Sequence, residues 1–209
     1  IDVTANYGIA ADKSHSHCVV VTDLDGDGGQ DFIVVQQHQS QATIDAVILS
    51  PAGAKHVLTA VDTSTFIPDM GCALADLDAD GRGDLILTGT AGLAVYGNDG
   101  DGAFSDKTAA WLPAEMDYKS FAVAAGDLDG DGDIDLLVGA GTEPDGCEFT
   151  CVYETADFKC PYHKPQKTGQ KLQDRVLIRK GSLPLVDETS QWNLPLGEGE
   201  SLGVALLDI

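Results

Sequence analysis

The chain has few basic residues, and it lacks both the long apolar runs and the signal sequence that mark several common classes of protein. It holds 12 lysines and arginines against 34 aspartates and glutamates, a formal net charge of −22. A field of this sign argues against nucleic acid as a partner. No apolar run approaches the roughly 18–20 residues of a membrane span, and residues 1–3 do not begin a signal peptide.

Signatures of catalysis are also missing. The sequence contains no His-Glu-x-x-His motif and no phosphate-binding loop. The alternating serines and histidines of 14–17 suggest a nucleophile or metal pair, but alternate residues ahead of a strand are more often surface polar groups. We therefore expect that this chain is not an enzyme, and leave open catalytic residues elsewhere in a longer protein.

Acidic residues are instead concentrated in three loops with the pattern D-x-D-x-D-G-x-x-D, which start at Asp23, Asp76 and Asp127. Four carboxylates within nine residues repel one another unless a hard cation lies among them, and Ca²⁺ takes six to eight oxygens at about 2.3–2.6 Å. The glycine at position 6 permits a sharp turn. The pattern predicts side-chain ligands at positions 1, 3, 5 and 9, and a carbonyl ligand at position 7.

Three Ca²⁺ sites follow from this pattern. Loop 1 would use the side chains of Asp23, Asp25, Asp27 and Asp31, and the carbonyl of Gly29. Loop 2 would use Asp76, Asp78, Asp80 and Asp84, and the carbonyl of Arg82. Loop 3 would use Asp127, Asp129, Asp131 and Asp135, and the carbonyl of Asp133. Because three bound ions would offset much of the repulsion, we expect the metal-free protein to be destabilised.

Each loop lies between two strand-like segments. An EF-hand would need helices and a glutamate at position 12, where this chain has Val34, Leu87 and Val138. Four short strands are predicted around the first loop, at Val19–Thr22, Phe32–Gln36, Ile44–Leu49 and His56–Ala60. The segment 97–102 offers only two carboxylates, so we expect a tight turn there rather than a metal site.

The loops recur with a period that indicates a repeat architecture, because their starts lie 53 and 51 residues apart. A second landmark, Asp-x-Thr, has the same phase, with copies at 2–4, 106–108 and 187–189 and a weaker one at 61–63. Residues 202–208 repeat the approach to a fourth loop. The predicted repeats of this single domain are 1–54, 55–103, 104–184 with an insertion at 141–173, and an incomplete 185–209.

These residues resemble the FG-GAP or VCBS repeats, whose calcium-loop blades build the β-propeller of integrin α-subunits and many secreted proteins. The Phe-x-Asp-x-Thr landmark looks closest to the branch containing cartilage acidic protein and related bacterial secreted proteins. The resemblance implies an all-β propeller of four-stranded antiparallel blades, with the metal loop between the first two strands and usually seven blades. About three blades and the start of a fourth are present, so we expect part of a longer chain; a complete four-unit protein is the alternative.

The same resemblance implies calcium-dependent protein or glycan recognition, adhesion or surface assembly outside the cell. Millimolar extracellular calcium suits loops without the glutamate at position 12. Two other roles stay open: an accessory propeller domain of a secreted enzyme or redox complex, and an architectural subunit of an extracellular filament. Expected partners are a protein or glycan ligand, further blades or other copies of the chain.

Cysteines and basic residues gather in the insertion. Cys147, Cys151, Cys160 and His163 could hold zinc, but an extracellular loop would more often carry a disulfide with one cysteine left over. Cys18 and Cys72 precede their loops by five and four residues and so have opposite pleat phase; we expect both to be buried as small apolar side chains. Seven of the twelve basic residues fall in 159–180. They could form a docking surface for an acidic partner, or they could be solvated charges that keep the segment soluble.

Overall fold

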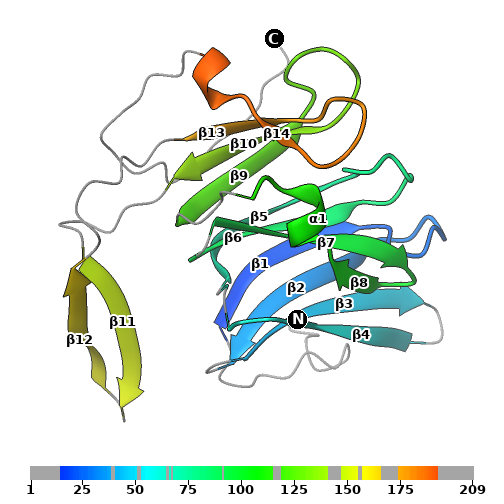
Figure 1. Ribbon diagram of the computed structural model, residues 1–209. Coiled ribbons are helices and arrows are strands. Elements are labelled where there is room, and N and C mark those ends of the chain that lie inside the picture. Colours follow the sequence, from blue (N-terminus) through cyan, green and yellow to red (C-terminus); the bar gives the residue numbers. More distant parts are fainter. Residues whose placement is uncertain are drawn as a thin grey trace.

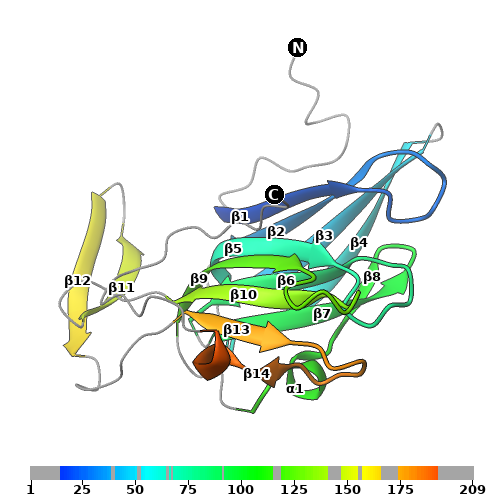
Figure 2. The same cartoon turned by 90° about the horizontal axis from the view of Figure 1, so that it is seen from above.

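The computed structural model describes residues 15–38, 41–50, 53–64, 66, 68–90, 92–114, 119–140, 147–154, 157–165 and 174–192. Their regular secondary structure is nearly all β-strand, and the strands form three four-stranded antiparallel sheets and one two-stranded hairpin. The three sheets stack side by side, while the hairpin lies apart from them (Figures 1 and 2). The predicted all-β fold with propeller-like blades is confirmed, and the described blades do not close a ring.

The first blade has its four strands in chain order: β1 (His15–Thr22), β2 (Asp31–His38), β3 (Gln41–Ser50) and β4 (Gly53–Val61). All four strands predicted around loop 1 are therefore present, each longer than expected. Alternate positions of β2 and β3, at Ile33, Val35, Ile44 and Ala46, are fully buried in the cluster shared with the second blade. This period of two is what one buried sheet face requires.

The second blade follows the same order, with β5 (Pro68–Ala75), β6 (Asp84–Gly89), β7 (Gly92–Gly100) and β8 (Ala103–Asp106). Its strand β6 is buried at every position. Leu85 packs in the cluster shared with the first blade and Ile86 in the cluster shared with the third. A strand buried on both faces explains the unbroken apolar run at 85–87. The turn expected at 97–102 is shorter in the structure: residues 97–100 belong to β7, and 101–102 join β7 to β8.

The third blade consists of β9 (Ser120–Gly126), β10 (Asp135–Ala140), β13 (Arg175–Ile178) and β14 (Val186–Asp187). Between β10 and β13 the chain forms the separate hairpin of β11 (Cys147–Glu154) and β12 (Asp157–Pro165), which falls within the expected insertion. The repeat copies at 2–4 and 202–208 lie outside the described residues.

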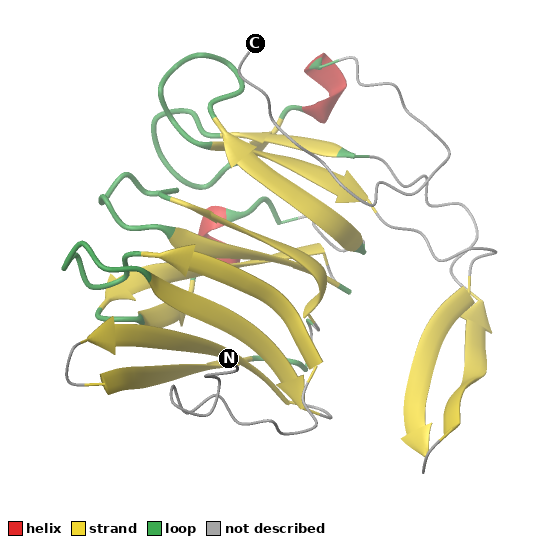
Figure 3. Ribbon diagram, turned by 180° about the vertical axis from the view of Figure 1, so that it is seen from behind, coloured by secondary structure: helices red, strands yellow, loops and turns green. Residues whose placement is uncertain are grey.

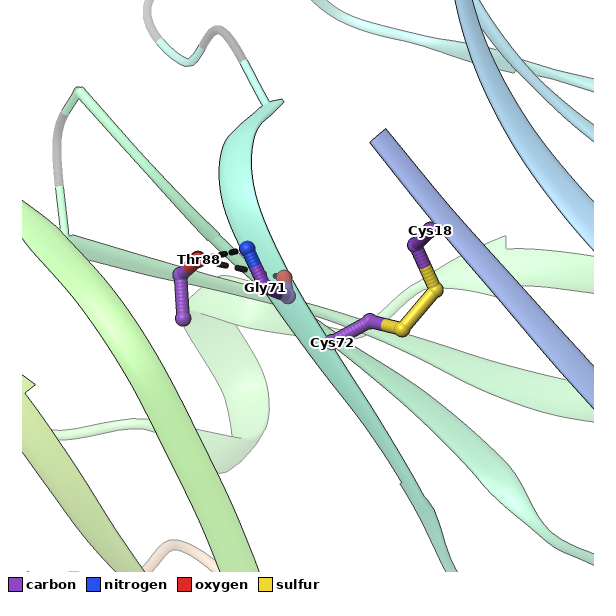
Figure 4. Close-up of a disulfide and its surroundings, with 4 residues drawn as sticks. All are labelled: Cys18, Gly71, Cys72 and Thr88. Atoms are coloured by element: carbon purple, nitrogen blue, oxygen red, sulfur yellow. Dashed lines mark hydrogen bonds between the residues drawn. A yellow bond between two sulfur atoms is a disulfide. The ribbon is translucent and has the colours of Figure 1, made fainter. Parts of the chain in front are cut away.

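A disulfide between Cys18 and Cys72 joins the innermost strands of the first two blades (Figure 4), with a Cα–Cα distance of 6.0 Å. The expectation of two separate apolar side chains was wrong. The pleat phase was assigned correctly, because Cys18 is buried while its neighbour Val19 is exposed. Two stacked blades, however, contact each other through opposite faces of their sheets. Side chains that meet between equivalent strands must therefore lie an odd number of positions apart when each is counted from its own loop, as Cys18 and Cys72 do.

The second and third blades approach closely at Gly71, next to this disulfide (Figure 4). A Cβ added at Gly71 would lie 2.9 Å from the carbonyl oxygen of Phe121 in β9. The register of β5 against β6 is irregular between Pro68 and Cys72, and the fully buried Thr88 compensates. Its hydroxyl accepts a hydrogen bond from the Gly71 N–H at 2.7 Å and donates to the Gly71 carbonyl at 3.1 Å. Glycine is thus required by the spacing of the blades.

The Asp-x-Thr landmark ends the outer strand of a blade and ties it to the third strand. In the second blade, Thr108 N–H donates to Asp106 at 2.8 Å, and Val95 N–H of β7 donates to the Thr108 hydroxyl at 3.0 Å. Thr108 opens the short helix α1 (Thr108–Trp111). In the third blade, Thr189, which opens the 3₁₀ helix η3 (Thr189–Gln191), makes the equivalent bonds with Asp187 and Val176.

Candidate metal centres

The three aspartate loops join the first two strands of each blade, β1–β2, β5–β6 and β9–β10, as predicted. Because the blades stack in the same orientation, the loops gather at one end of the sheet stack, where Figure 3 shows them as green connections. Position 12 of each loop, at Val34, Leu87 and Val138, lies within a strand. The geometry therefore excludes an EF-hand.

The aspartate at position 9 anchors each loop to its blade. Asp31, Asp84 and Asp135 are at most 1% exposed. In each, one carboxylate oxygen accepts the N–H of loop position 2, at 2.8–2.9 Å. The other accepts an N–H at or next to the end of the third strand, at 2.8–3.0 Å. These donors are Leu24, Leu77 and Leu128 within the loops, and Leu49, Asn98 and Arg179 beyond them. Position 9 thus fixes the loop even before any ligand is considered.

The aspartate at position 1 folds the loop around its own carboxylate. In loop 3, Asp127 accepts the N–H groups of Gly130 at 2.7 Å and Gly132 at 3.0 Å. Gly132 at position 6 has a φ of +91° and Gly130 at position 4 one of +82°. Loop 2 has alanine at position 4, and Ala79 is held at a φ of +62°, a conformation that costs a non-glycine residue about 1–2 kcal/mol. The positive φ at position 4 was not predicted, although the glycines of loops 1 and 3 signal it.

Each loop brings three carboxylates together. One oxygen from each lies within 4.8 Å of the others in the sets Asp23, Asp25, Asp27; Asp76, Asp78, Asp84; and Asp127, Asp129, Asp135. Two oxygens bound to the same Ca²⁺ lie at most about 4.6–5.2 Å apart, given bonds of about 2.3–2.6 Å. The sets therefore fit a hard cation in both chemistry and spacing. Their oxygens are already close, so little rearrangement is needed to bind one.

Not every predicted ligand belongs to these sets. Asp31 in loop 1, and Asp80 and Asp131 at position 5 of loops 2 and 3, lie outside them. The carboxylates of Asp80 and Asp131 instead accept the N–H of position 7, from Arg82 and Asp133, at 2.9 Å. Asp27 accepts the N–H of Gly29 in the same way. The predicted carbonyl ligands at position 7 stay a prediction.

Burial makes two of the anchoring carboxylates harder to ionise. The pKa of Asp84 rises to about 6, because burial outweighs the hydrogen bonds from Asn98 and Leu77, and Asp78 and Asp80 add repulsion. Burial likewise raises the pKa of Asp135, with repulsion from Asp129 and Asp131 contributing. A cation in either loop would oppose both effects, since it favours the ionised form. The loops are thus electrostatically unfavourable without one.

Basic side chains approach the loops unequally. In loop 2, Arg82 pairs with Asp80, and its Nε donates to the carbonyl of Asn98 at 2.8 Å. In loop 3, Arg179 Nη1 lies 3.4 Å from Asp133, and Lys180 Nζ lies 3.2 Å from Asp129. Arg179 and Lys180, with Arg175, which pairs with Asp187, belong to the seven basic residues expected in or just after the insertion, and all three follow it. These three thus face acidic groups of their own blade.

The hairpin of the insertion carries the cysteines for which two alternatives were predicted. Cys147 and Cys151 lie four residues apart on β11. In the backbone register, Thr150 pairs with Tyr162 and Val152 with Lys159, so Cys151 lies opposite Cys160 and Pro161. Both alternatives, a disulfide and a zinc site that includes His163, stay predictions.

Comparison with known families agrees with these features. The model of the FG-GAP-like repeat matches residues 76–138, from the first aspartate of loop 2 to the strand that follows loop 3. The comparison with curated proteins gave no match. Among the described residues, no helix has the length and apolar character to cross a membrane. The recurring strand, aspartate loop and strand of residues 76–138 are thus similar to the FG-GAP-like repeat.

Proposed function

We propose that this chain is a calcium-binding β-propeller module that serves protein or glycan recognition, adhesion or surface assembly outside the cell. The observation that carries the metal assignment is that each of three loops at the same end of the blades brings three carboxylates together, always including those of positions 1 and 3. A single acidic cluster is common on protein surfaces. Three clusters built on the same buried anchor are better explained by a shared ligand.

The ligands would be the carboxylates of positions 1, 3, 5 and 9 with the carbonyl of position 7. The ion would supply positive charge that offsets their repulsion and closes each loop between its two strands. Carboxylates without nitrogen or sulfur ligands favour Ca²⁺ or Mg²⁺ over transition metals. The flexible loop and the number of available oxygens favour the larger ion, because Mg²⁺ demands near-ideal octahedral geometry and keeps several waters.

An extracellular setting is supported by the disulfide between Cys18 and Cys72, since disulfides persist in oxidising compartments. Calcium at the millimolar level is available there. For recognition, the rigid blades would act as the scaffold and their connections as the contact surface, as in many proteins whose loops carry function. We assign no catalytic role to this chain, because the carboxylates are committed to the metal loops.

Calcium titration of the purified chain tests the metal assignment. Isothermal titration should show three bound Ca²⁺ per chain, and each site should contribute about 2.7 kcal/mol of stability at a hundredfold excess over its Kd. Calorimetry in EDTA should therefore give a markedly lower melting temperature, and Asp129→Ala should remove one site.

Asp101→Asn is the matched control, because Asp101 lies in the β7–β8 turn with a φ of +52° that asparagine tolerates. This variant should still bind three ions. A melting curve that EDTA leaves unchanged would show that the loops are only turns.

The recognition role is tested by deleting 144–170 and joining the ends with a short glycine-rich turn. The blades and their calcium affinity should be retained, because the other two blades have no such insertion. Self-association, followed by sedimentation velocity, should weaken, and the difference should be larger at low salt. Unchanged association would place the contact surface on the blades instead.

A further inference from the structure

The three metal loops share one pattern but differ in the positive charge beside them. Among the described residues, no lysine or arginine pairs with a carboxylate of loop 1, one arginine pairs within loop 2, and two basic residues reach loop 3. Calcium loops tune their affinity through the charge of the ligand set. Equal affinity at the three loops is therefore not expected.

Among the basic residues that the structure describes, Lys180 alone pairs with a carboxylate of a close oxygen set. Its Nζ lies 3.2 Å from Asp129 Oδ2, and Asp129 belongs to the set of loop 3. Arg82 pairs with Asp80, a proposed ligand that lies outside the close set of loop 2, and Arg179 pairs with Asp133, whose proposed ligand is its carbonyl and not its carboxylate. The ammonium of Lys180 therefore competes directly for an oxygen that a cation would use.

The position of Lys180 is fixed by the fold. The preceding residue, Arg179, donates its backbone N–H to Asp135 at 2.8 Å, which holds this part of the chain against loop 3. The ammonium is also held from the other side, because it lies 3.3 Å from Glu188 Oε2. Glu188 lies between the aspartate and threonine of the Asp-x-Thr landmark. Lys180 thus bridges the metal loop and the outer edge of the same blade.

We propose that Lys180 is an internal competitor that lowers the calcium affinity of loop 3 relative to loop 1, so that the loops fill in sequence as calcium rises. This inference rests on the proposed calcium binding. When Ca²⁺ binds Asp129, Lys180 must withdraw toward Glu188 or remain as a repelling charge. A single positive charge about 5–6 Å from a divalent ion changes its affinity roughly three- to tenfold at physiological salt.

The test isolates loop 3 in the full 209-residue chain. Asp25→Asn and Asp78→Asn disable loops 1 and 2, and calcium binding to the remaining loop is measured by isothermal titration. Adding Lys180→Gln should raise the affinity about three- to tenfold. Lys180→Arg keeps the charge and should bind as the parent does.

Lys55→Gln is the matched control, since the Lys55 ammonium donates to the carbonyl of Asp101 at 3.4 Å, in the turn between β7 and β8 of the second blade, and this variant should change the affinity less than twofold. Equal affinities for Lys180→Gln and Lys55→Gln would overturn the inference and leave the calcium assignment intact. No calcium binding to the unmodified chain would overturn the calcium assignment itself. Circular dichroism of each variant separates a folding defect from either outcome.

Discussion

The disulfide between Cys18 and Cys72 should be a main source of stability for the stack of blades. It closes a loop with a sequence separation of 54 residues, for which the chain-entropy relation gives about 4 kcal/mol. Unfolding increases the entropy by about 2.1 cal/mol/K per residue, here for a chain of 209 residues. Losing about 4 kcal/mol of stability therefore lowers the melting temperature by roughly 10 °C. We therefore expect Cys18→Ala/Cys72→Ala to melt about 10 °C below the oxidised chain.

The assay is differential scanning calorimetry of the oxidised chain, the reduced chain and the double variant, all in saturating calcium. The reduced chain and the double variant should melt at similar temperatures. The triple variant Cys147→Ala/Cys151→Ala/Cys160→Ala is the control, because it keeps the disulfide between the blades and removes the cysteines of the hairpin. It should melt near the oxidised chain and still respond to reductant.

Two results would refute this reasoning. A double variant that melts within about 2 °C of the oxidised chain would mean that the link contributes little to the stack, against the entropy relation. Peptide mapping without reductant that finds no fragment joining Cys18 to Cys72 would remove the link itself. A large loss in the triple variant would instead place the main stabilising bond in the insertion.

Two further predictions concern loop 2. Ala79→Gly should raise the melting temperature and the calcium affinity of the loop, because it relieves a left-handed conformation that costs about 1–2 kcal/mol. Gly130→Ala, at the same position of loop 3, should lower both quantities. Changes of the same sign in the two variants would contradict the argument. The raised pKa of Asp84, about 6, should make calcium affinity fall as pH drops through 6, because protons then compete for the carboxylate. In EDTA, folded Asp84 holds its proton up to about pH 6, whereas the unfolded chain loses it at about pH 4. The free energy of unfolding therefore includes the full contribution of this proton below about pH 4 and loses it as the pH rises through 6. An NMR titration of the Asp84 carboxyl with a midpoint near 4 would contradict both statements.

The sequence alone determined the repeated unit of this protein. The aspartate spacing, the glycine at position 6 and the alternating apolar residues are local signals, because turn geometry and pleat depend on residues close in the chain. They sufficed to place three loops between first and second strands, the four strands of the first blade and a turn within 97–102, of which the structure assigns 97–100 to β7. Leucine recurs at position 2 of every loop, at Leu24, Leu77 and Leu128. This recurrence is a local signal for the anchoring of the loop by the aspartate at position 9, which was not among the predictions.

Tertiary structure decided which side chains meet between and beyond these units. Cys18 and Cys72 pair because neighbouring blades present opposite faces to each other, a relation that strand periodicity does not contain. Asp31, Asp84 and Asp135 act as anchors because the third strand of each blade returns to the loop. Lys180 reaches Asp129, 51 residues away in the chain, for the same reason. Local sequence fixes a turn or a strand, whereas the stacking and return of strands fix contacts between distant residues, and these contacts make three similar loops unequal.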